Sequence, residues 1–136
     1  MIFNGLGREH PWIDRVGAYV LLLDMTDRNH LGKSISSGTP WLKAKVQDGF
    51  LILGDLIRKE QIEDPHNMNL ELKINGEVRQ QDNTGNMNYK IDDQVNYMEE
   101  NGPILFQEGD LLMSGTPEGI APVIEGDVLE ASLRCP

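Results

Sequence analysis

Two groups of polar residues stand where apolar runs of the sequence end, and their chemistry could bind charged groups. Gly115 and Thr116 follow the apolar run 111–113, and Asp24 follows the apolar run 16–23. A backbone N–H in a glycine loop, together with a threonine hydroxyl, can hold a small anion. Two buried strands that end in such polar groups suggest one shared site.

Each feature also has a purely structural interpretation. A loop of glycine and proline such as 115–119 is, by itself, more often a turn after a strand than a binding loop. An aspartate after an apolar run, as at Asp24, is more often a turn or helix N-cap residue than a metal ligand, because its carboxylate accepts local backbone N–H groups. Neither feature alone predicts a function.

The elements that must position these groups are mostly strands. The continuous apolar run 16–23 predicts a strand buried on both faces. The stretch 29–37 has a loosely helical pattern and is closed by Gly38 and Pro40.

A β-hairpin is the clearest local prediction. Apolar and charged residues alternate over 70–74, Asn75-Gly76 suits a tight turn with two positive φ angles, and 77–80 returns as the second strand.

Further along the chain, one helix and two strands are predicted. Residues 91–98 carry apolar side chains at helical spacing, with Asp92 and Asp93 suited to the first turn and Gly102-Pro103 at the end. Glu-Gly-Asp triplets at 108–110 and 125–127 each introduce a predicted strand, 111–114 and 128–133. Carboxylates two residues apart could hold a metal, but a polar turn that leads into a strand explains both triplets.

The composition indicates a single domain over residues 1–136, with 39% hydrophobic and 25% charged residues. A net charge of −10 argues against nucleic acid or an anionic membrane surface as partner. Cys135 is the only cysteine, which excludes a disulfide within the chain and a zinc site of several thiolates. The longest apolar stretch, 16–23, is too short to span a bilayer, and residues 1–5 do not have the pattern of a targeting peptide.

A series of short motifs runs in order through most of the chain, from about Val16 to Leu133. The motifs are Leu23-Asp24-Met25-Thr26 with Arg28, Gly38-Thr39-Pro40-Trp41 with Ala44-Lys45, Asp48-Gly49-Phe50 with Gly54, Asp64-Pro65-His66, Asn75-Gly76-Glu77-Val78-Arg79-Gln80, Asn83-Thr84 with Met87, Glu108-Gly109-Asp110, and Gly115-Thr116-Pro117 with Gly119. The series resembles the fumarylacetoacetate hydrolase family, and within it the acylpyruvate hydrolase and oxaloacetate decarboxylase branch.

The resemblance implies a fold and an activity. The fold would be mixed and mainly β, a β-roll around a central cavity with short outer helices, of which residues 1–136 form one partial catalytic domain. Members of the family hydrolyse or decarboxylate small 2-oxo and 1,3-dioxo acids around a bound Mg²⁺ or Mn²⁺. The family commonly forms homodimers, so the resemblance implies a homodimer or a subunit of a larger assembly, in mitochondria or the cytoplasm.

The resemblance also assigns site residues. Asp24 matches one of three carboxylates that hold the metal, an oxygen ligand of the kind that Mg²⁺ prefers. Lys45 matches a lysine that stabilises the charge of the enolate. Gly115 and Thr116 match the loop that contacts the substrate carboxylate. Arg28 is predicted with them as a substrate-binding residue, more as an ion-pair partner that supports the site than as a direct contact.

The sequence also departs from the family pattern. The other two metal carboxylates belong to a Glu-x-Glu strand, yet residues 1–15 offer only Glu9 and Asp14, at the wrong spacing, and the lid that carries the activating His and Glu is missing. The histidines of this chain are interpreted as surface or turn residues rather than bases; they are His10, His30 and His66. We therefore expect a fragment or a degenerate relative.

Three functions remain open at this point. One is an acylpyruvase-like, metal-dependent hydrolase or decarboxylase of small 2-oxo acids, inactive as this chain alone. The second is a non-catalytic structural subunit that retains the family scaffold. The third is a metal-free binder of small keto acids that uses Lys45 and Thr116.

Overall fold

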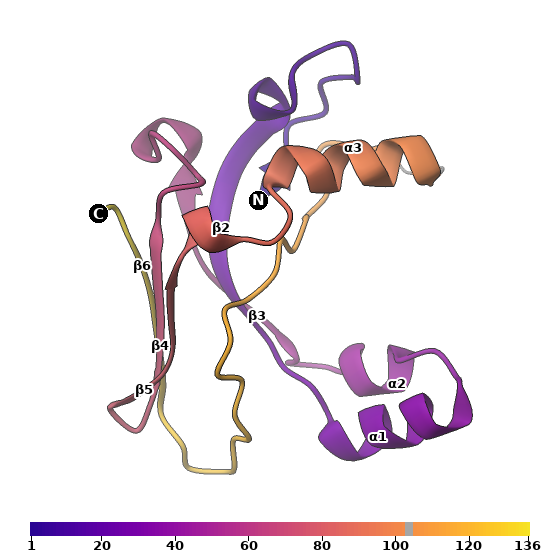
Figure 1. The fold of residues 1–136 in the computed structure, drawn as a ribbon, viewed down its shortest axis with the longest axis vertical. Helices are drawn as coiled ribbons and strands as arrows, with labels where there is room; N and C mark the ends of the chain where they lie inside the picture. Colours follow the sequence, from indigo (N-terminus) through magenta and orange to yellow (C-terminus); the bar gives the residue numbers. More distant parts are fainter. Residues whose placement is uncertain (103–104) are drawn as a thin grey trace. The chain divides into compact units, whose positions relative to one another are not determined.

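The computed structural model describes residues 1–102 and 105–136. They form two compact units, a large unit of residues 1–19 and 56–136 and a small unit of residues 20–55. Two three-stranded sheets have the orders β1-β2-β3 and β5-β4-β6 (Figure 1). The elements are β1 (Ile2–Phe3), η1 (Trp12–Arg15), β2 (Val16–Asp24), α1 (Arg28–Ser37), α2 (Leu42–Lys45), β3 (Leu51–Arg58), η2 (Lys59–Gln61), β4 (Asn69–Ile74), β5 (Glu77–Asn83), η3 (Thr84–Asn86), α3 (Ile91–Asn101) and β6 (Leu129–Arg134). The mainly β fold with short helices is confirmed.

The sheet β5-β4-β6 is antiparallel throughout and begins with the predicted hairpin. Asn75 and Gly76 have φ angles of 53° and 81°, the two left-handed positions of a tight turn. Asn75 also joins the hairpin to β6, because its Oδ1 accepts a hydrogen bond from the Val128 N–H at 2.9 Å. The hairpin prediction is confirmed, and so is a strand at 128–133, within one residue at each end.

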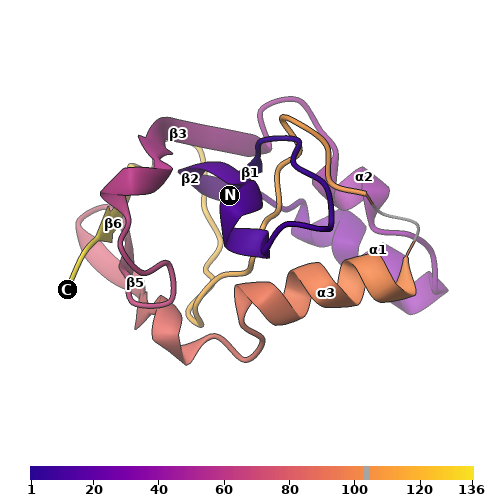
Figure 2. The same cartoon turned by 90° about the horizontal axis from the view of Figure 1, so that it is seen from above.

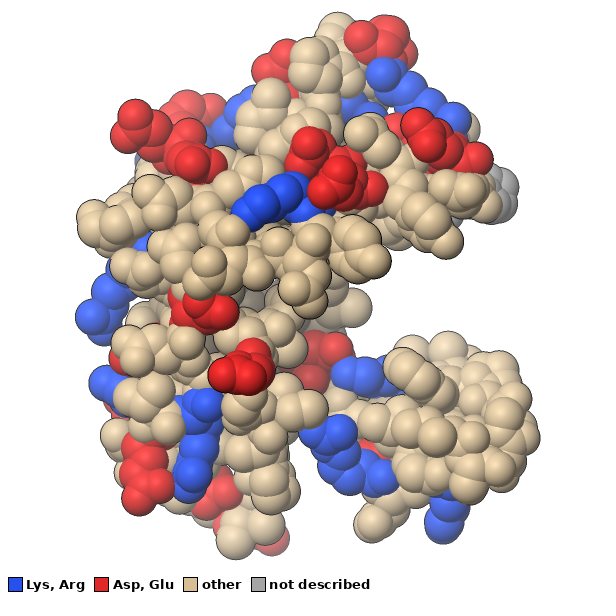
Figure 3. All heavy atoms as spheres, in the orientation of Figure 1, with Lys and Arg blue, Asp and Glu red and all other residues tan. Residues whose placement is uncertain are grey.

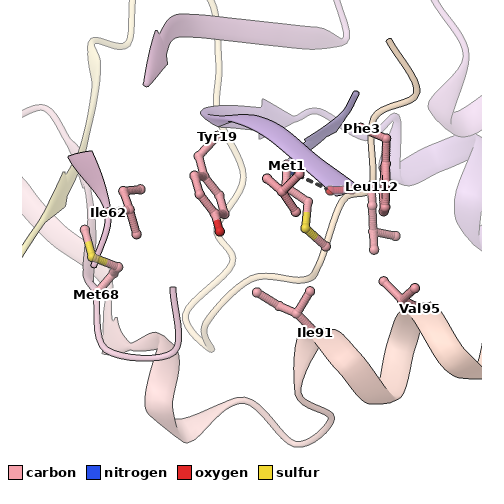
Figure 4. Packing of buried hydrophobic residues seen from close by; sticks show 9 residues of the cluster. Met1, Phe3, Tyr19, Ile62, Met68, Ile91, Val95 and Leu112 are labelled. Carbon is pink, nitrogen blue, oxygen red and sulfur yellow. Dashed lines mark hydrogen bonds between the residues drawn. The ribbon is translucent and has the colours of Figure 1, made fainter. Parts of the chain in front are cut away.

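The hydrophobic core lies in the large unit, beneath helix α3. Ile91 and Val95, one helical turn apart, face this core, and Val95 is fully buried. Figure 4 shows both side chains pointing toward Met1 and Leu112. The predicted helix over 91–98 is confirmed, with Asp92 and Asp93 in its first turn; Gly102 ends it, and Pro103 lies outside the described residues. The buried core consists of Met1, Phe3, Val16, Tyr19, Ile62, Met68, Ile91, Val95 and Leu112.

A buried ion pair joins α3 to η1, and Figure 2 shows these two helices side by side. The Arg15 guanidinium donates to both carboxylate oxygens of Glu99, at 3.2 and 2.5 Å, although only 3% of the Arg15 side chain is exposed. The guanidinium also lies 5.6 Å from the ring centre of Phe3, which stacks on Phe106. Charge pairing and aromatic packing therefore position the C-terminal half of α3.

The predicted strand over 111–114 is wrong. Only Leu111 forms a β-bridge, with Ile2, because the partner strand β1 is two residues long. The preceding turn is confirmed: Asp110 accepts the Gln107 N–H through its carboxylate. At the second triplet, Asp127 accepts the Ile124 N–H in the same way, so both acidic triplets form turns.

The small unit has little core of its own. Among its residues only Ser34 and Ala44 are buried, and the side chains of β2 from Val20 to Leu23 are half-buried. The prediction that β2 is buried on both faces is therefore wrong, because too few apolar side chains surround this half of the strand. Helix α1 confirms the predicted helix over 29–37 and ends at Gly38, whose φ of 63° is left-handed.

Candidate functional site

Asp24 and Lys45 form an ion pair in the small unit. The ammonium of Lys45 donates to Oδ2 of Asp24 at 2.7 Å, across 21 residues of sequence. Asp24 is the last residue of β2, and Lys45 is the last residue of α2. The structure thus brings together two of the residues that the resemblance placed in one site.

Local hydrogen bonds explain why these two side chains meet. The Met25 N–H donates to Phe50 O at 2.8 Å, which holds the residue after Asp24 next to the start of β3. The Asp27 N–H donates to Ala44 O at 3.0 Å, which holds α2 beside the start of α1. Asp27 also caps α1, because its Oδ1 accepts the His30 N–H.

The ion pair is half-exposed and leaves hydrogen-bonding capacity for a ligand. The side chains of Lys45 and Asp24 are 33% and 42% exposed, so the pair contributes on the order of 0–1 kcal/mol to stability. An ammonium has three N–H donors, and Asp24 accepts one of them. The other N–H groups of Lys45 can donate to an anion, a carboxylate or an enolate oxygen.

Arg28 and His30 lie near this pair in sequence but have other surroundings. Arg28 is exposed in the first turn of α1 and makes no ion pair with the described residues, and its supporting role stays a prediction. His30 Nδ1 lies 2.7 Å from Asp27 Oδ2, and this hydrogen bond lowers the pKa of Asp27. His30 is exposed, as expected.

The loop at Gly115, Thr116 and Pro117 lies in the large unit and is held by glutamines. Nε2 of Gln80 donates to Thr116 Oγ1 at 2.8 Å and to Pro117 O at 2.6 Å. Nε2 of Gln94, on α3, donates to Ser114 O at 3.0 Å. Gly115 has a φ of 121°, a conformation that requires glycine.

Sequence reasoning missed the role of both glutamines. Gln80 belongs to one of the quoted motifs. The feature that could have revealed its role is a polar residue at an inward position of the second hairpin strand. Gln80 is 8% exposed, and a buried amide must find partners. Gln94 gives no comparable signal, because a glutamine on a half-exposed helix face is ordinary.

His66 was interpreted as a surface or turn residue, and the structure corrects half of this. The turn is present, since the His66 N–H donates to Asp64 Oδ1 at 2.8 Å. The side chain is half-buried, however, and its Nε2 accepts the Ile91 N–H at the start of α3 at 3.0 Å. His66 therefore caps a helix, which sequence could not show across 25 residues.

The described residues do not fit a divalent metal by themselves. No group of three His, Cys, Asp or Glu side chains able to hold an ion occurs within 1–102 and 105–136. Asp24 offers one carboxylate, already paired with Lys45. Mg²⁺ requires a near-octahedral set of oxygen ligands, so Asp24 alone would leave it largely hydrated.

Two surface depressions of the large unit are not lined by the predicted site residues. One of about 380 Å³ lies over β4, β5 and β6 and has a polar lining that includes Glu71, Asp82 and Arg134. Another of about 450 Å³ lies beside Asp64 and Cys135. Neither is lined by Thr116 or Gly115.

Comparison with known proteins shows the relationship directly. Residues 12–135 match the family described as fumarylacetoacetate (FAA) hydrolase C-terminal. The chain belongs to this family. Mitochondrial oxaloacetate tautomerases are among its relatives: the Schizosaccharomyces pombe protein is 43% identical over 91% of this chain and 55% of its own length. The Homo sapiens protein is 39% identical over 90% of this chain and 54% of its own length. The chain thus spans about half the length of these relatives.

Solved structures of the family have the same fold. The fumarylpyruvate hydrolase of Pseudomonas aeruginosa, solved with Mn²⁺ and pyruvate, superposes with a TM-score of 0.88 at 26% identity, over 97% of this chain and 57% of that one. The maleylpyruvate hydrolase of Sphingobium superposes with a TM-score of 0.76 at 28% identity, over 97% of this chain and 45% of that one. No helix among the described residues is long and apolar enough to cross a membrane.

Proposed function

We propose that this family member provides the part of an enzyme site that binds a small 2-oxo acid and stabilises its enolate. The observation that carries the proposal is the Lys45 ammonium, held 2.7 Å from Asp24 with N–H donors to spare. A positioned cation next to a developing enolate oxygen lowers the barrier for any reaction that passes through that enolate. Lys45 is thus the proposed catalytic residue.

Thr116 and Gly115 are the proposed contacts with the substrate carboxylate. Thr116 is exposed, and its oxygen already accepts the Gln80 amide, so its hydroxyl hydrogen remains to donate. Arg28, with an exposed guanidinium, is a further proposed contact or support for an anionic substrate. These roles rest on the family relationship together with the chemistry of each side chain.

Three reactions share the enolate step, and the relatives favour one of them. Hydrolysis of an acylpyruvate and decarboxylation of oxaloacetate break a C–C bond and leave an enolate. Tautomerisation of oxaloacetate moves a proton through the same kind of intermediate, and it is the activity named for relatives that are 36–43% identical. We therefore propose oxaloacetate or a close 2-oxo acid as substrate, and an acylpyruvate as the second candidate.

We include a divalent metal in the proposal only to the extent that Asp24 would be one of its ligands. A family structure contains Mn²⁺, and Asp24 is the carboxylate of this chain that the resemblance assigns to Mg²⁺ or Mn²⁺. Because Asp24 stands in no cluster of three ligand-type side chains among the described residues, we assign no step of the reaction to the ion.

A non-catalytic structural subunit is the alternative from another class. The absence of a three-ligand cluster among the described residues favours it, since a scaffold can persist without activity. A metal-free keto-acid binder would use Lys45 and Thr116 but not Asp24. In the structure Asp24 pairs directly with Lys45, which argues that the two side chains act together.

We also propose a homodimer, because a strand at the edge of a sheet exposes apolar side chains. Strand β3 ends the order β1-β2-β3, and Leu51, Ile52, Leu53 and Leu56 on it are 47–67% exposed. Such an edge needs a partner or a cover. In Figure 3 the surface over α1 and α2 is also largely uncharged on the face in view. Light scattering that gives the mass of a monomer would contradict the dimer.

Localisation in mitochondria is proposed from the relatives, whose names place them there, with the cytoplasm as the alternative.

Binding of oxalate tests the main proposal, because oxalate mimics the enolate of a 2-oxo acid. We expect titration of the 136-residue chain in metal-free buffer to shift the NMR signals of Lys45 and Thr116, with a Kd on the order of millimolar. Lys45→Met should weaken binding about tenfold, because a charge-assisted hydrogen bond is lost. Lys43→Met, on the same short helix, is the matched control and should bind normally. If oxalate shifts the NMR signals of neither Lys45 nor Thr116, the result supports the structural subunit instead.

A further inference from the structure

We propose that Gln80 is a positioning residue for the substrate loop, which fixes the direction of the Thr116 hydroxyl. The inference rests on the proposed function, in which Thr116 donates to the substrate carboxylate. It adds a reason why that hydroxyl presents its hydrogen, and not its lone pairs, to a ligand.

Both N–H groups of the Gln80 amide are used on this loop. Nε2 carries two hydrogens, and the two acceptors within reach are Thr116 Oγ1 at 2.8 Å and Pro117 O at 2.6 Å. Gln80 is 8% exposed in the middle of β5, where it pairs with Leu72 of β4. A buried amide on a paired strand has little freedom to rotate away.

This arrangement determines the polarity of Thr116. An amide nitrogen can only donate, so the threonine oxygen must accept, and its own hydrogen has to point elsewhere. Thr116 is exposed, so the hydrogen, which is excluded from the position facing Gln80, is left to donate to an anion that binds from solvent. A free threonine hydroxyl would instead rotate among its staggered positions and present lone pairs for part of the time.

The backbone around Thr116 is fixed from two other directions. Gly119 approaches β5 so closely that a Cβ there would lie 1.9 Å from Arg79 O, which excludes any other residue. On the other side, Gln94 of α3 donates to Ser114 O at 3.0 Å. With the backbone held at both ends, the remaining freedom is the hydroxyl rotor that Gln80 controls.

Removal of the Gln80 amide tests the inference without adding charge. Gln80→Met keeps the length of the side chain and should raise the Kd for oxalate about threefold to tenfold. The matched control is Gln81→Met, at the next residue of β5, which is exposed and donates through Nε2 to Glu71 Oε2 at 3.5 Å. The control should bind oxalate as the unchanged chain does.

A double-mutant cycle with Thr116→Val separates positioning from general damage to the fold. If Gln80 acts through the hydroxyl, Gln80→Met should have no further effect on oxalate binding once Thr116 is valine. An equal loss in both backgrounds would mean that Gln80 only supports the fold, and would overturn the inference.

Gln80→Glu supplies a second test, which decides the question if Gln80→Met fails to fold. The carboxylate would accept the Thr116 hydrogen and reverse the hydroxyl, so oxalate binding should fall at neutral pH. Binding relative to the unchanged chain at the same pH should recover as the pH falls and the introduced acid becomes a donor, whereas a ratio that does not change with pH would overturn the inference. If the unchanged chain shows no oxalate shift at all, the proposed function itself fails; normal binding by Gln80→Met overturns the inference alone.

Discussion

His66 Nε2 accepts a hydrogen bond from the Ile91 backbone N–H at 3.0 Å, so an imidazole caps helix α3 from a loop 25 residues earlier. The N-cap residue of this helix is Lys90, whose side chain makes no capping hydrogen bond. His66 thus satisfies one of the free N–H groups at the helix start. The helix that it caps carries both Gln94, which holds the substrate loop, and the core residue Val95.

Loss of this cap should destabilise the protein measurably. We expect His66→Ala to lower the free energy of unfolding by about 1 kcal/mol, as for other lost caps. His10→Ala is the control, because His10 is exposed and contacts Glu9 at 3.6 Å on the surface. Urea denaturation measures both, and equal midpoints for the two variants would contradict the capping role.

Tyr19 should make stability fall at alkaline pH. Burial, and then the charge of Asp64, raise the pKa of Tyr19 to about 12, against an ordinary value of 10.0. Between these values the unfolded chain loses the phenol proton while the folded chain keeps it, so unfolding becomes easier as pH rises. The stability that the folded state gains by keeping Tyr19 protonated is lost progressively as the pH rises from 10 towards 12, and below pH 10 Tyr19 causes no loss. Thermal melts across this range should show the fall.

Replacement of the hydroxyl provides the control for that pH effect. The Tyr19 hydroxyl is buried and has no hydrogen-bond partner among the described residues. Tyr19→Phe should therefore leave the stability at neutral pH unchanged or raise it by about 1 kcal/mol, because an unsatisfied polar group is removed. It should also remove this part of the alkaline loss. A lower stability at neutral pH would mean that the hydroxyl is satisfied in solution.

Substitution of Gly76 in the hairpin turn should lower the stability of the protein through backbone strain. A Cβ at this position would meet no atom within 4 Å, so the φ of 81° is the only constraint. Gly76→Val should cost about 1–3 kcal/mol of stability through strain. Gly76→Asn is the matched variant and should cost less, because asparagine tolerates the left-handed region. Equal melting temperatures for both variants would contradict this account.

The 136-residue chain should bind Mg²⁺ weakly and should not turn over acylpyruvate or oxaloacetate. The described residues supply Asp24 but no cluster of three ligand-type side chains around it, and Mg²⁺ releases its water reluctantly. Calorimetry with Mg²⁺ and Mn²⁺, together with assays of oxaloacetate depletion and tautomerisation, measures both parts. Micromolar affinity together with turnover would contradict this prediction, and would direct the search for ligands to the turns at Glu108 with Asp110 and Glu125 with Asp127.

The prediction of weak Mg²⁺ binding concerns the carboxylates of the two turns as well as Asp24. Asp110 and Asp127 accept backbone N–H groups at 2.8 and 2.9 Å. The hydrogen bond from the Ile124 N–H, and then the one that the Asn75 amide donates, lower the pKa of Asp127. Each carboxylate thus closes its own turn, in agreement with the assignment of both triplets to turns rather than to a metal site.

Local chemistry let the sequence alone determine several elements. Asn75-Gly76 favours a turn with positive φ angles, and the spacing of Ile91 and Val95, with Asp92 and Asp93 between them in the first turn, favours a helix. These features depend on residues within one turn or one hairpin of each other. The order of motifs also identified the family, which the match over residues 12–135 confirms.

Tertiary structure alone decided the features that depend on distant partners. Residues 111–114 look like a strand, but a strand needs a neighbour, and β1 is two residues long. Gln80 holds Thr116 across 36 residues, and Lys45 reaches Asp24 across 21. No local pattern encodes such pairs, because a hydrogen bond between distant residues forms only where packing brings donor and acceptor together.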